Sequence, residues 1–74
     1  MNTQETREYL AEKIKERRKA RQLTQNQLAE LLQVSKKGTI NRWESGVSRV
    51  PARELPRLSA VLNTPVAELL GYED

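Results

Sequence analysis

Apolar residues recur along the chain at intervals of three and four positions, which is the spacing of one face of an α-helix. Nowhere does the strict alternation of apolar and polar residues that is typical of a half-buried β-strand appear. The pattern therefore predicts an all-α fold, a compact bundle of about five short helices without repeats or low-complexity segments.

The first helix is predicted over residues 6–21 and the second over about 25–32. Thr24 stands immediately before the second helix, and Gln27 follows three positions later, which is the pattern of a capping box. A helix of this length is too short to be stable alone and needs packing against neighbours. The apolar positions that define these two helices are Leu10, Ile14, Leu28, Leu31 and Leu32.

The third helix is predicted over about 37–45. Ile40 and Trp43 lie three positions apart, so both should face the core, and this makes the tryptophan a core residue and not a stacking platform. Gly46 is typical of a left-handed C-terminal stop. Residues 47–51 then form a loop.

Two further helices follow this loop. Pro56 is compatible with the fourth helix only in or beside its first turn, and Asn63 closes that helix. Thr64 is expected as the N-cap of the fifth helix, with Pro65 at its first position and Gly71 as its stop. The apolar positions that mark these two helices are Leu55, Leu58, Val61, Leu62, Val66, Leu69 and Leu70.

The length of 74 residues is enough for one small domain, expected over 1–74 with a core of about 6–71. Cysteine and histidine are absent, which excludes thiol nucleophiles, disulfides, zinc ribbons and imidazole bases. The carboxylates, Glu68 among them, are expected on solvent faces without a paired, apolar setting. We therefore expect no catalytic residue, no metal, no cofactor and no small-molecule ligand. No apolar run approaches the roughly 18–20 residues of a membrane span, so we expect no membrane contact and a cytoplasmic, nucleoid-associated protein.

Basic residues are concentrated in two blocks, although the formal net charge is only +3. Two basic blocks between acidic ends indicate either a polyanion-binding face or solvated helix surfaces. The first block contains Lys13, Lys15, Arg17, Arg18, Lys19 and Arg21, opposed by Glu16; the second contains Lys36, Lys37, Arg42 and Arg49, opposed by Glu44.

Two short helices with polar and basic side chains on the outer face of the second are typical of a helix-turn-helix. The major groove of B-DNA admits one helix, whose side chains then reach the base edges. Arginine and lysine pair with guanine, asparagine pairs with adenine, and threonine offers a hydroxyl and a methyl group. The expected base-contacting residues are Lys37, Thr39, Asn41 and Arg42.

Over roughly residues 10–70 the chain resembles the Xre/Cro family of lambda-repressor-like DNA-binding domains. Single pieces of the shared pattern are weak signals, but the ordered set at these spacings is specific. The matching positions are Leu23-Thr24-Gln25, Leu28-Ala29, Val34-Ser35, Thr39-Ile40, Arg42-Trp43-Glu44, Gly46 and Pro51.

The resemblance implies roles for further residues. Gln25 matches a glutamine that contacts a DNA phosphate and braces the reading helix, while Arg49 and Arg53 lie in a loop that approaches phosphates or is simply solvated. Arg18 and Glu44 match a structural ion pair that ties the first helix to the end of the third. Breaking such a pair costs about 3–5 kcal/mol when it is deeply buried.

The chain departs from the family pattern at two places. The turn between Val34 and Ile40 contains one additional residue; we assign Lys36 in this turn to phosphate contact, with a base edge or water as alternatives. Arg17 replaces an apolar residue, which predicts a thinner core and a broader basic surface. Gly38 is interpreted as a helical glycine that permits close approach to DNA at some cost in helix stability.

The predicted function is sequence-specific binding of double-stranded DNA by a phage- or bacterial-type transcriptional repressor, as a homodimer at least when bound to DNA. The chain is either complete or the N-terminal part of a longer repressor. The alternative is a protein-interaction module such as an antitoxin or a coactivator-like domain. An enzyme and a single-strand binder are disfavoured because histidine and cysteine are absent and exposed aromatic residues are scarce.

Overall fold

The computed structural model describes residues 3–34 and 38–72, and over these ranges the chain is all-α, as predicted. Five α-helices and one short 3₁₀ helix, η1, follow one another without a strand in the described part. Their bounds are α1 Thr3–Ala20, α2 Gln25–Leu32, α3 Thr39–Ser45, η1 Ala52–Glu54, α4 Leu55–Leu62 and α5 Val66–Leu70.

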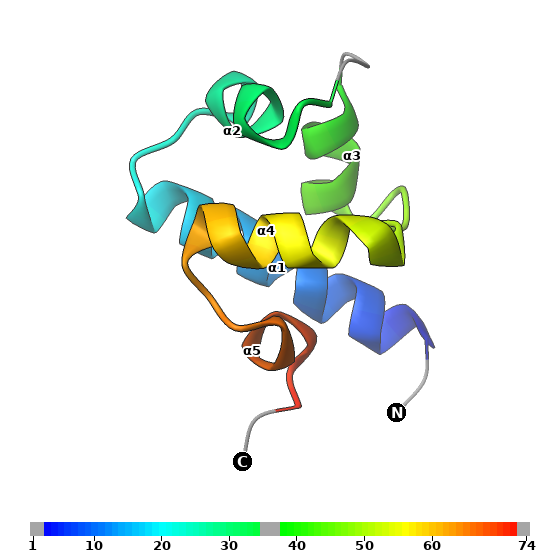
Figure 1. Ribbon diagram of the computed structural model, residues 1–74. Coiled ribbons are helices and arrows are strands. Elements are labelled where there is room, and N and C mark those ends of the chain that lie inside the picture. The colour runs from blue at the N-terminus through cyan, green and yellow to red at the C-terminus, as the bar shows by residue number, and fades with distance from the viewer. Residues whose placement is uncertain (1–2, 35–37, 73–74) are drawn as a thin grey trace.

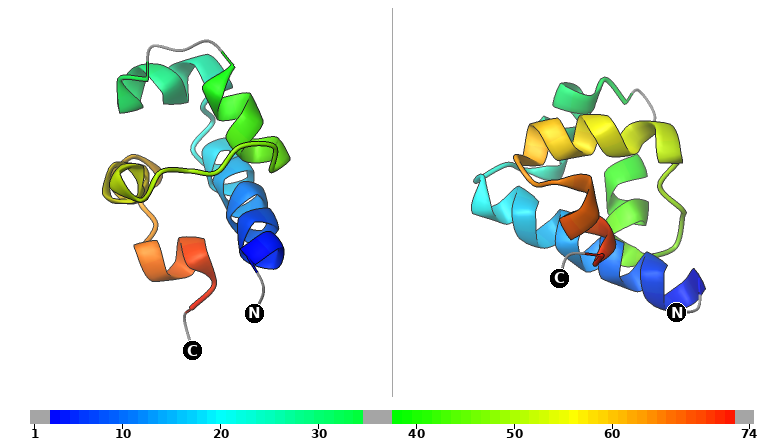
Figure 2. Two further views of the ribbon diagram at one scale, coloured as in Figure 1. Left: turned by 90° about the vertical axis from the view of Figure 1, so that its right-hand side faces the viewer. Right: turned by 60° about the horizontal axis from the view of Figure 1, so that its bottom comes forward.

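The long helix α1 supports the other helices (Figure 1). It packs against α3 and α5, while α2 packs against α3 and α4. The left view of Figure 2 shows α2 and α3 together at the top of the molecule and α5 at the bottom, with α4 between them in height. This arrangement holds α3 at the edge of the bundle, where one of its faces remains open.

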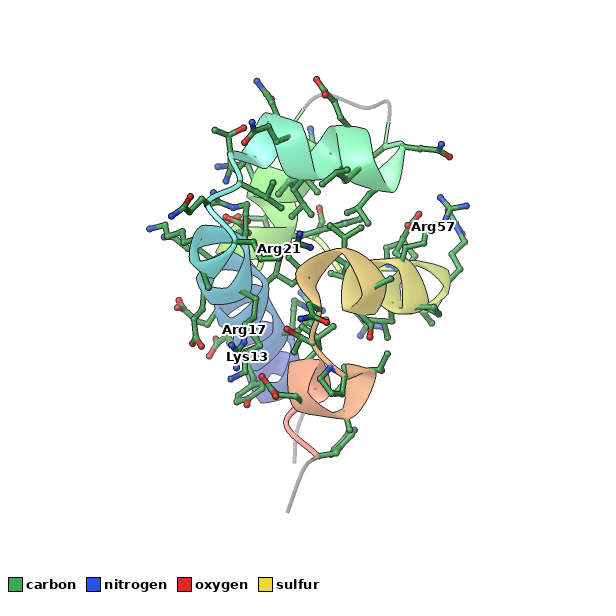
Figure 3. All side chains as sticks on the ribbon, turned by 60° about the vertical axis from the view of Figure 1, so that its left-hand side comes forward. Lys13, Arg17, Arg21 and Arg57 are labelled. Atoms are coloured by element: carbon green, nitrogen blue, oxygen red, sulfur yellow. The ribbon has the colours of Figure 1, made fainter. Side chains whose placement is uncertain are left out.

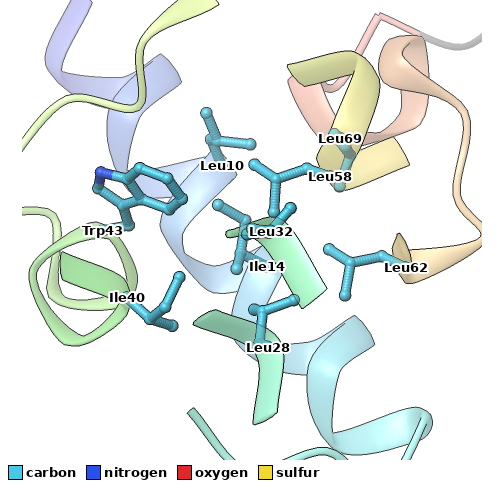
Figure 4. Packing of buried hydrophobic residues seen from close by; sticks show 9 residues of the cluster. All are labelled: Leu10, Ile14, Leu28, Leu32, Ile40, Trp43, Leu58, Leu62 and Leu69. Carbon is cyan, nitrogen blue, oxygen red and sulfur yellow. The ribbon is translucent and has the colours of Figure 1, made fainter. Parts of the chain in front are cut away.

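A single apolar cluster fills the space between the helices (Figure 4). Every α-helix contributes to this cluster, and Trp43 is only 5% exposed, which confirms its predicted core position. Leu31 is the exception among the predicted apolar positions of α2, because it is 54% exposed. The members are Leu10, Ile14, Leu28, Leu32, Ile40, Trp43, Leu58, Leu62 and Leu69.

The helix ends follow the predicted capping signals with one exception. The capping box at α2 is confirmed: Thr24 Oγ1 accepts from the Gln27 backbone N–H at 3.0 Å, and the Gln27 side chain returns a bond at 2.8 Å. The N-cap role of Thr64 is wrong, because Pro65 occupies the cap position of α5. The buried Thr64 hydroxyl instead donates to the Leu62 carbonyl at 3.0 Å.

The start of α3 also corrects the sequence interpretation. Gly38 is the N-cap of α3 and has a φ of +83°, so it does not lie inside the helix. A residue with a Cβ is strained in this left-handed conformation, which gives a local reason for glycine here. We therefore assign Gly38 to the entry into α3. Lys36 and Lys37 lie outside the described residues.

Four other helix ends agree with the predicted punctuation. Pro56 lies in the first turn of α4, where a missing N–H is tolerated. Gly46, Asn63 and Gly71 each follow the last residue of a helix in a left-handed conformation, and their N–H groups bond back to carbonyls of the preceding turn. The α1 helix begins at Thr3, earlier than expected, because its first polar residues carry no apolar periodicity.

Candidate nucleic-acid interface

The helices α2 and α3 form a pair whose inner faces are buried. Leu28 and Leu32 of α2 and Ile40 of α3 all lie in the core cluster. Their apolar contacts fix the position of α3 relative to α2. The outer face of α3 therefore belongs to a helix whose inner face is firmly packed. The capping box determines where α2 begins, which fixes the position of the polar residues in its first turn.

The helix α3 is sharply divided into a buried and an exposed face. Ile40, Trp43 and Glu44 are buried, whereas Asn41 and Arg42 are exposed. Thr39, the first residue of α3, is half-buried, and it takes part in a hydrogen-bonding or electrostatic interaction. The structure therefore brings three of the four expected base-contacting residues onto one short helix, and the fourth, Lys37, lies outside the described residues.

A cleft of about 320 Å³ lies beside α3, between this helix and the segment that follows it. Thr39 lines this cleft, and so do Arg49 and Arg53, the two arginines expected to contact phosphates. Both arginines are exposed, and neither takes part in an ion pair or hydrogen bond within the described part of the chain. The cleft thus places two arginines near α3, together with one acidic residue, Glu54.

Gln25, at the start of α2, is half-buried and linked to α3. Its side-chain amide Nε2 donates to Glu44 Oε1 at 3.1 Å. This bond fixes the amide against α3 while leaving one of its two N–H donors for another acceptor. The geometry therefore supplies the bracing contact between the first turn of α2 and the reading helix that the family resemblance implies.

Arg18 and Glu44 form an ion pair beneath α3. The Arg18 Nε donates to Glu44 Oε2 at 2.6 Å, and Nη2 donates to Oε1 at 3.0 Å. Both residues are only 8% exposed, and Arg18 Nη1 also donates to the Leu23 carbonyl at 2.7 Å. One guanidinium thus joins α1, the segment before α2 and α3. Through Glu44 this network continues to Gln25.

Two further basic residues of α1, Lys13 and Arg17, and Arg21 just after its end make contacts within the protein (Figure 3). Arg17 pairs with Glu68 of α5, Lys13 Nζ lies 4.0 Å from the same carboxylate, and Arg21 donates to the Val61 carbonyl of α4. The Glu68 side chain is only 17% exposed. The expectation that Glu68 lies on a solvent face is therefore wrong, and most of the first basic block joins helices.

Arg57 is a structural residue that the sequence did not reveal. Its Nη1 donates to the Leu32 carbonyl at 3.3 Å, at the C-terminal end of α2 (Figure 3). Cations near a helix C-terminus stabilise its unpaired carbonyls. Because the two partners are 25 positions apart, no local motif could have indicated this bond.

Over 3–34 and 38–72, no cluster of three acidic, histidine or cysteine residues could hold a metal ion. No helix in the same ranges has the length and apolar character needed to cross a membrane.

Comparison with known proteins gives one result. The family model described as helix-turn-helix matches residues 14–69, which include α2, α3 and most of the core. Searches of curated proteins and of solved structures gave no match. The matched region contains the capped α2, the divided α3 and the Arg18–Glu44 pair. The chain therefore belongs to the helix-turn-helix family of DNA-binding domains of the Xre/Cro type.

Proposed function

We propose that the chain binds double-stranded DNA sequence-specifically and acts as a phage- or bacterial-type transcriptional repressor, with α3 in the major groove. The observation that carries this proposal is the division of α3, whose buried side is held by Ile40 and Trp43 while Asn41 and Arg42 are exposed. Because its apolar side stays packed in the core, such a helix can place its exposed side in a DNA groove without disrupting the fold.

The exposed side chains of α3 suit direct readout of base edges. Arg42 can donate two hydrogen bonds to the O6 and N7 atoms of guanine, and Asn41 can pair with N6 and N7 of adenine. Thr39 lies at the start of the same helix, and we assign the base contacts to these three residues together with Lys37. Each good bidentate pair discriminates by about 1–3 kcal/mol against a wrong base.

Contacts with the DNA backbone would come from residues that border α3. Gln25 lies at the start of α2, where its bond to Glu44 leaves an N–H donor for a phosphate oxygen. Arg49 and Arg53 share the cleft beside Thr39, so a phosphate group near α3 lies within the reach of positive charge. Lys36 is the fourth phosphate contact in this proposal.

A single reading helix of seven residues contacts few base pairs. We therefore infer that two copies bind a pseudo-palindromic operator as a homodimer. Their α3 helices would enter successive major grooves with half-sites about 34–36 Å apart, one helical turn. With roughly six to ten phosphate contacts, affinity should fall about 10³–10⁵-fold between 50 and 200 mM salt.

Selection of bound sequences from a random pool of double-stranded DNA tests this proposal, because it reports specificity, symmetry and half-site spacing together. The unmodified chain is expected to enrich a palindromic motif. The Arg42→Ala variant is expected to enrich the same motif with reduced base preference at one base pair of each half-site. The control Lys15→Ala removes an exposed positive charge from α1 and should leave the motif unchanged. A pool without an enriched motif, or an affinity insensitive to salt, would refute the proposal.

The protein-interaction alternative lacks a comparable observation. The large exposed apolar side chains Tyr9, Leu31, Val47 and Tyr72 each belong to a different segment of the chain. Single exposed apolar residues are ordinary on protein surfaces and do not mark an interface. Copurification of another protein combined with no binding to mixed duplex DNA at low salt would favour this alternative.

A further inference from the structure

A second cleft, of about 200 Å³, lies among the start of α1, the loop after α3 and the end of α5. Figure 2 (right) brings the first turns of α1 and the last turn of α5 forward. Of the expected base-contacting residues that the structure describes, none lines this cleft. Its lining residues are Arg7, Leu10, Arg49, Val50, Ala52, Leu55 and Leu70.

The lining of this cleft combines apolar side chains with two guanidinium groups. Leu10, Leu55 and Leu70 come from three different helices and form an apolar surface that is fixed by the core. Arg7 and Arg49 add positive charge to this surface. An apolar body with one negative group is the ligand chemistry that such a lining complements.

Arg7 has no acceptor of its own in the described part of the chain. Arg7 as a whole is half-buried, and its Nε atom is a buried donor without a hydrogen-bond partner. Arg17 Nε of the same helix is likewise a buried donor without a partner, but the guanidinium groups of Arg17 and Arg18 are both paired with carboxylates. Arg7 therefore brings to the cleft a guanidinium that no carboxylate of the described residues neutralises.

We propose that this cleft binds a small amphipathic carboxylate, with its carboxylate at Arg7 and Arg49 and its apolar body against the leucines. Planar guanidinium groups bind carboxylates through paired hydrogen bonds. A fully hydrophilic anion would leave the apolar surface of the cleft uncovered, and a neutral apolar molecule would leave Arg7 without an acceptor.

Arg49 gives this cleft a connection to the proposed DNA interface. It lines both the ligand cleft and the cleft beside α3 where it is proposed to contact a phosphate. A carboxylate that engages Arg49 therefore competes with the DNA backbone for the same guanidinium. Ligand binding should weaken DNA binding, and this second step, unlike the first, rests on the proposed function.

Titration of the full chain with sodium octanoate, followed by two-dimensional ¹H–¹⁵N NMR, tests the site. The expected result is saturable shifts at the amides of Leu10, Val50, Leu55 and Leu70. Octan-1-ol tests the apolar body without the charge, and acetate tests the charge without the body; each should bind at least tenfold more weakly. Equal binding of either control, or shifts without saturation, would overturn the proposal.

Matched variants separate the cleft from general positive charge. Arg7→Gln should weaken octanoate binding about tenfold or more, as expected for the loss of a charge-assisted contact. Arg53→Gln removes an arginine that does not line this cleft and should leave binding unchanged. Because Ala52 and Ala60 are both exposed, Ala52→Asp adds a repelling charge at the cleft, while Ala60→Asp is its control outside it. Equal effects within either pair would refute the assignment.

The DNA step is measured separately on a selected operator. Saturating octanoate should lower the DNA affinity of the unmodified chain but not that of Arg49→Gln, which lacks the shared group. Saturable octanoate binding with unchanged DNA affinity would refute the coupling while supporting the cleft. Failure to select any operator would refute the proposed function and leave the octanoate titration as an independent test of the site.

Discussion

The buried pair of Arg18 and Glu44 offers the sharpest test of how this small domain is stabilised. Replacing Arg18 by methionine keeps much of the side-chain volume but leaves the Glu44 carboxylate, in a residue that is 8% exposed, without its cation. It also removes three hydrogen bonds, including the one to the Leu23 carbonyl. We expect Arg18→Met to lower the free energy of unfolding by about 3–5 kcal/mol.

This loss is large for a chain of 74 residues. At the usual 0.05–0.15 kcal/mol per residue, the whole domain is stable by only roughly 4–11 kcal/mol. Arg18→Met should therefore remove a large fraction of the stability of the domain, and nearly all of it if that stability lies at the lower end of this range. Urea unfolding followed by circular dichroism and by the fluorescence of Trp43, the only tryptophan, measures the change directly.

A double variant separates the cost of an unpaired charge from the value of the pair. Arg18→Met with Glu44→Leu replaces both charges by apolar groups, and such replacements are often neutral or stabilising. We expect the double variant to be more stable than Arg18→Met alone. It should nevertheless bind DNA more weakly than the unmodified chain, because the bond from Gln25 to Glu44 is lost.

Two outcomes would refute this reasoning. If Arg18→Met costs less than about 1 kcal/mol, the pair behaves like an exposed salt bridge. If the double variant is no more stable than the single one, the cost does not arise from leaving Glu44 unpaired.

Further variants test the interface, the caps and the second ion-pair cluster. Arg42→Ala should relax specificity at one base pair by about 1–3 kcal/mol, whereas Arg49→Ala should weaken binding to all sequences alike and reduce the salt slope by about 1, both measured by competition binding. Thr24→Ala should cost about 1 kcal/mol in urea unfolding, and Thr24→Ser should restore most of it because the hydroxyl cap is kept. Glu68→Gln should cost up to about 1 kcal/mol, and the exposed Glu16→Gln much less; equal losses would contradict the assignment of Glu68 as a link between α1 and α5.

Local signals in the sequence predicted most of the fold. The three-residue spacing of Ile40 and Trp43 identified the buried side of α3 before any contact was known. The Thr24 and Gln27 pair located the start of α2 to the residue. Such signals work because capping and helical periodicity depend on residues only a few positions apart.

Contacts across the chain could not be predicted in the same way. Nothing near Arg17 indicates that its partner is Glu68, 51 positions away, or that Arg57 reaches the end of α2. The interpretation of Gly38 as a helical residue is wrong because a glycine inside a helix and a glycine at its N-cap look alike in sequence, and only the φ of +83° separates them. The Arg18–Glu44 pair was anticipated through the family resemblance alone.

The buried and the exposed positive charges have different roles, and this difference leads to a last prediction. The buried Arg18–Glu44 pair is shielded from ions, whereas the exposed Arg42, Arg49 and Arg53 are not. Raising salt from 50 to 200 mM should therefore release DNA while changing the melting temperature of the free protein by only a few degrees. Parallel measurement of DNA affinity and thermal unfolding checks this separation. If the melting temperature instead falls in parallel with DNA affinity, the charges that bind DNA are also those that hold the helices together. That result would contradict the assignment of stability to the buried ion pair between α1 and α3.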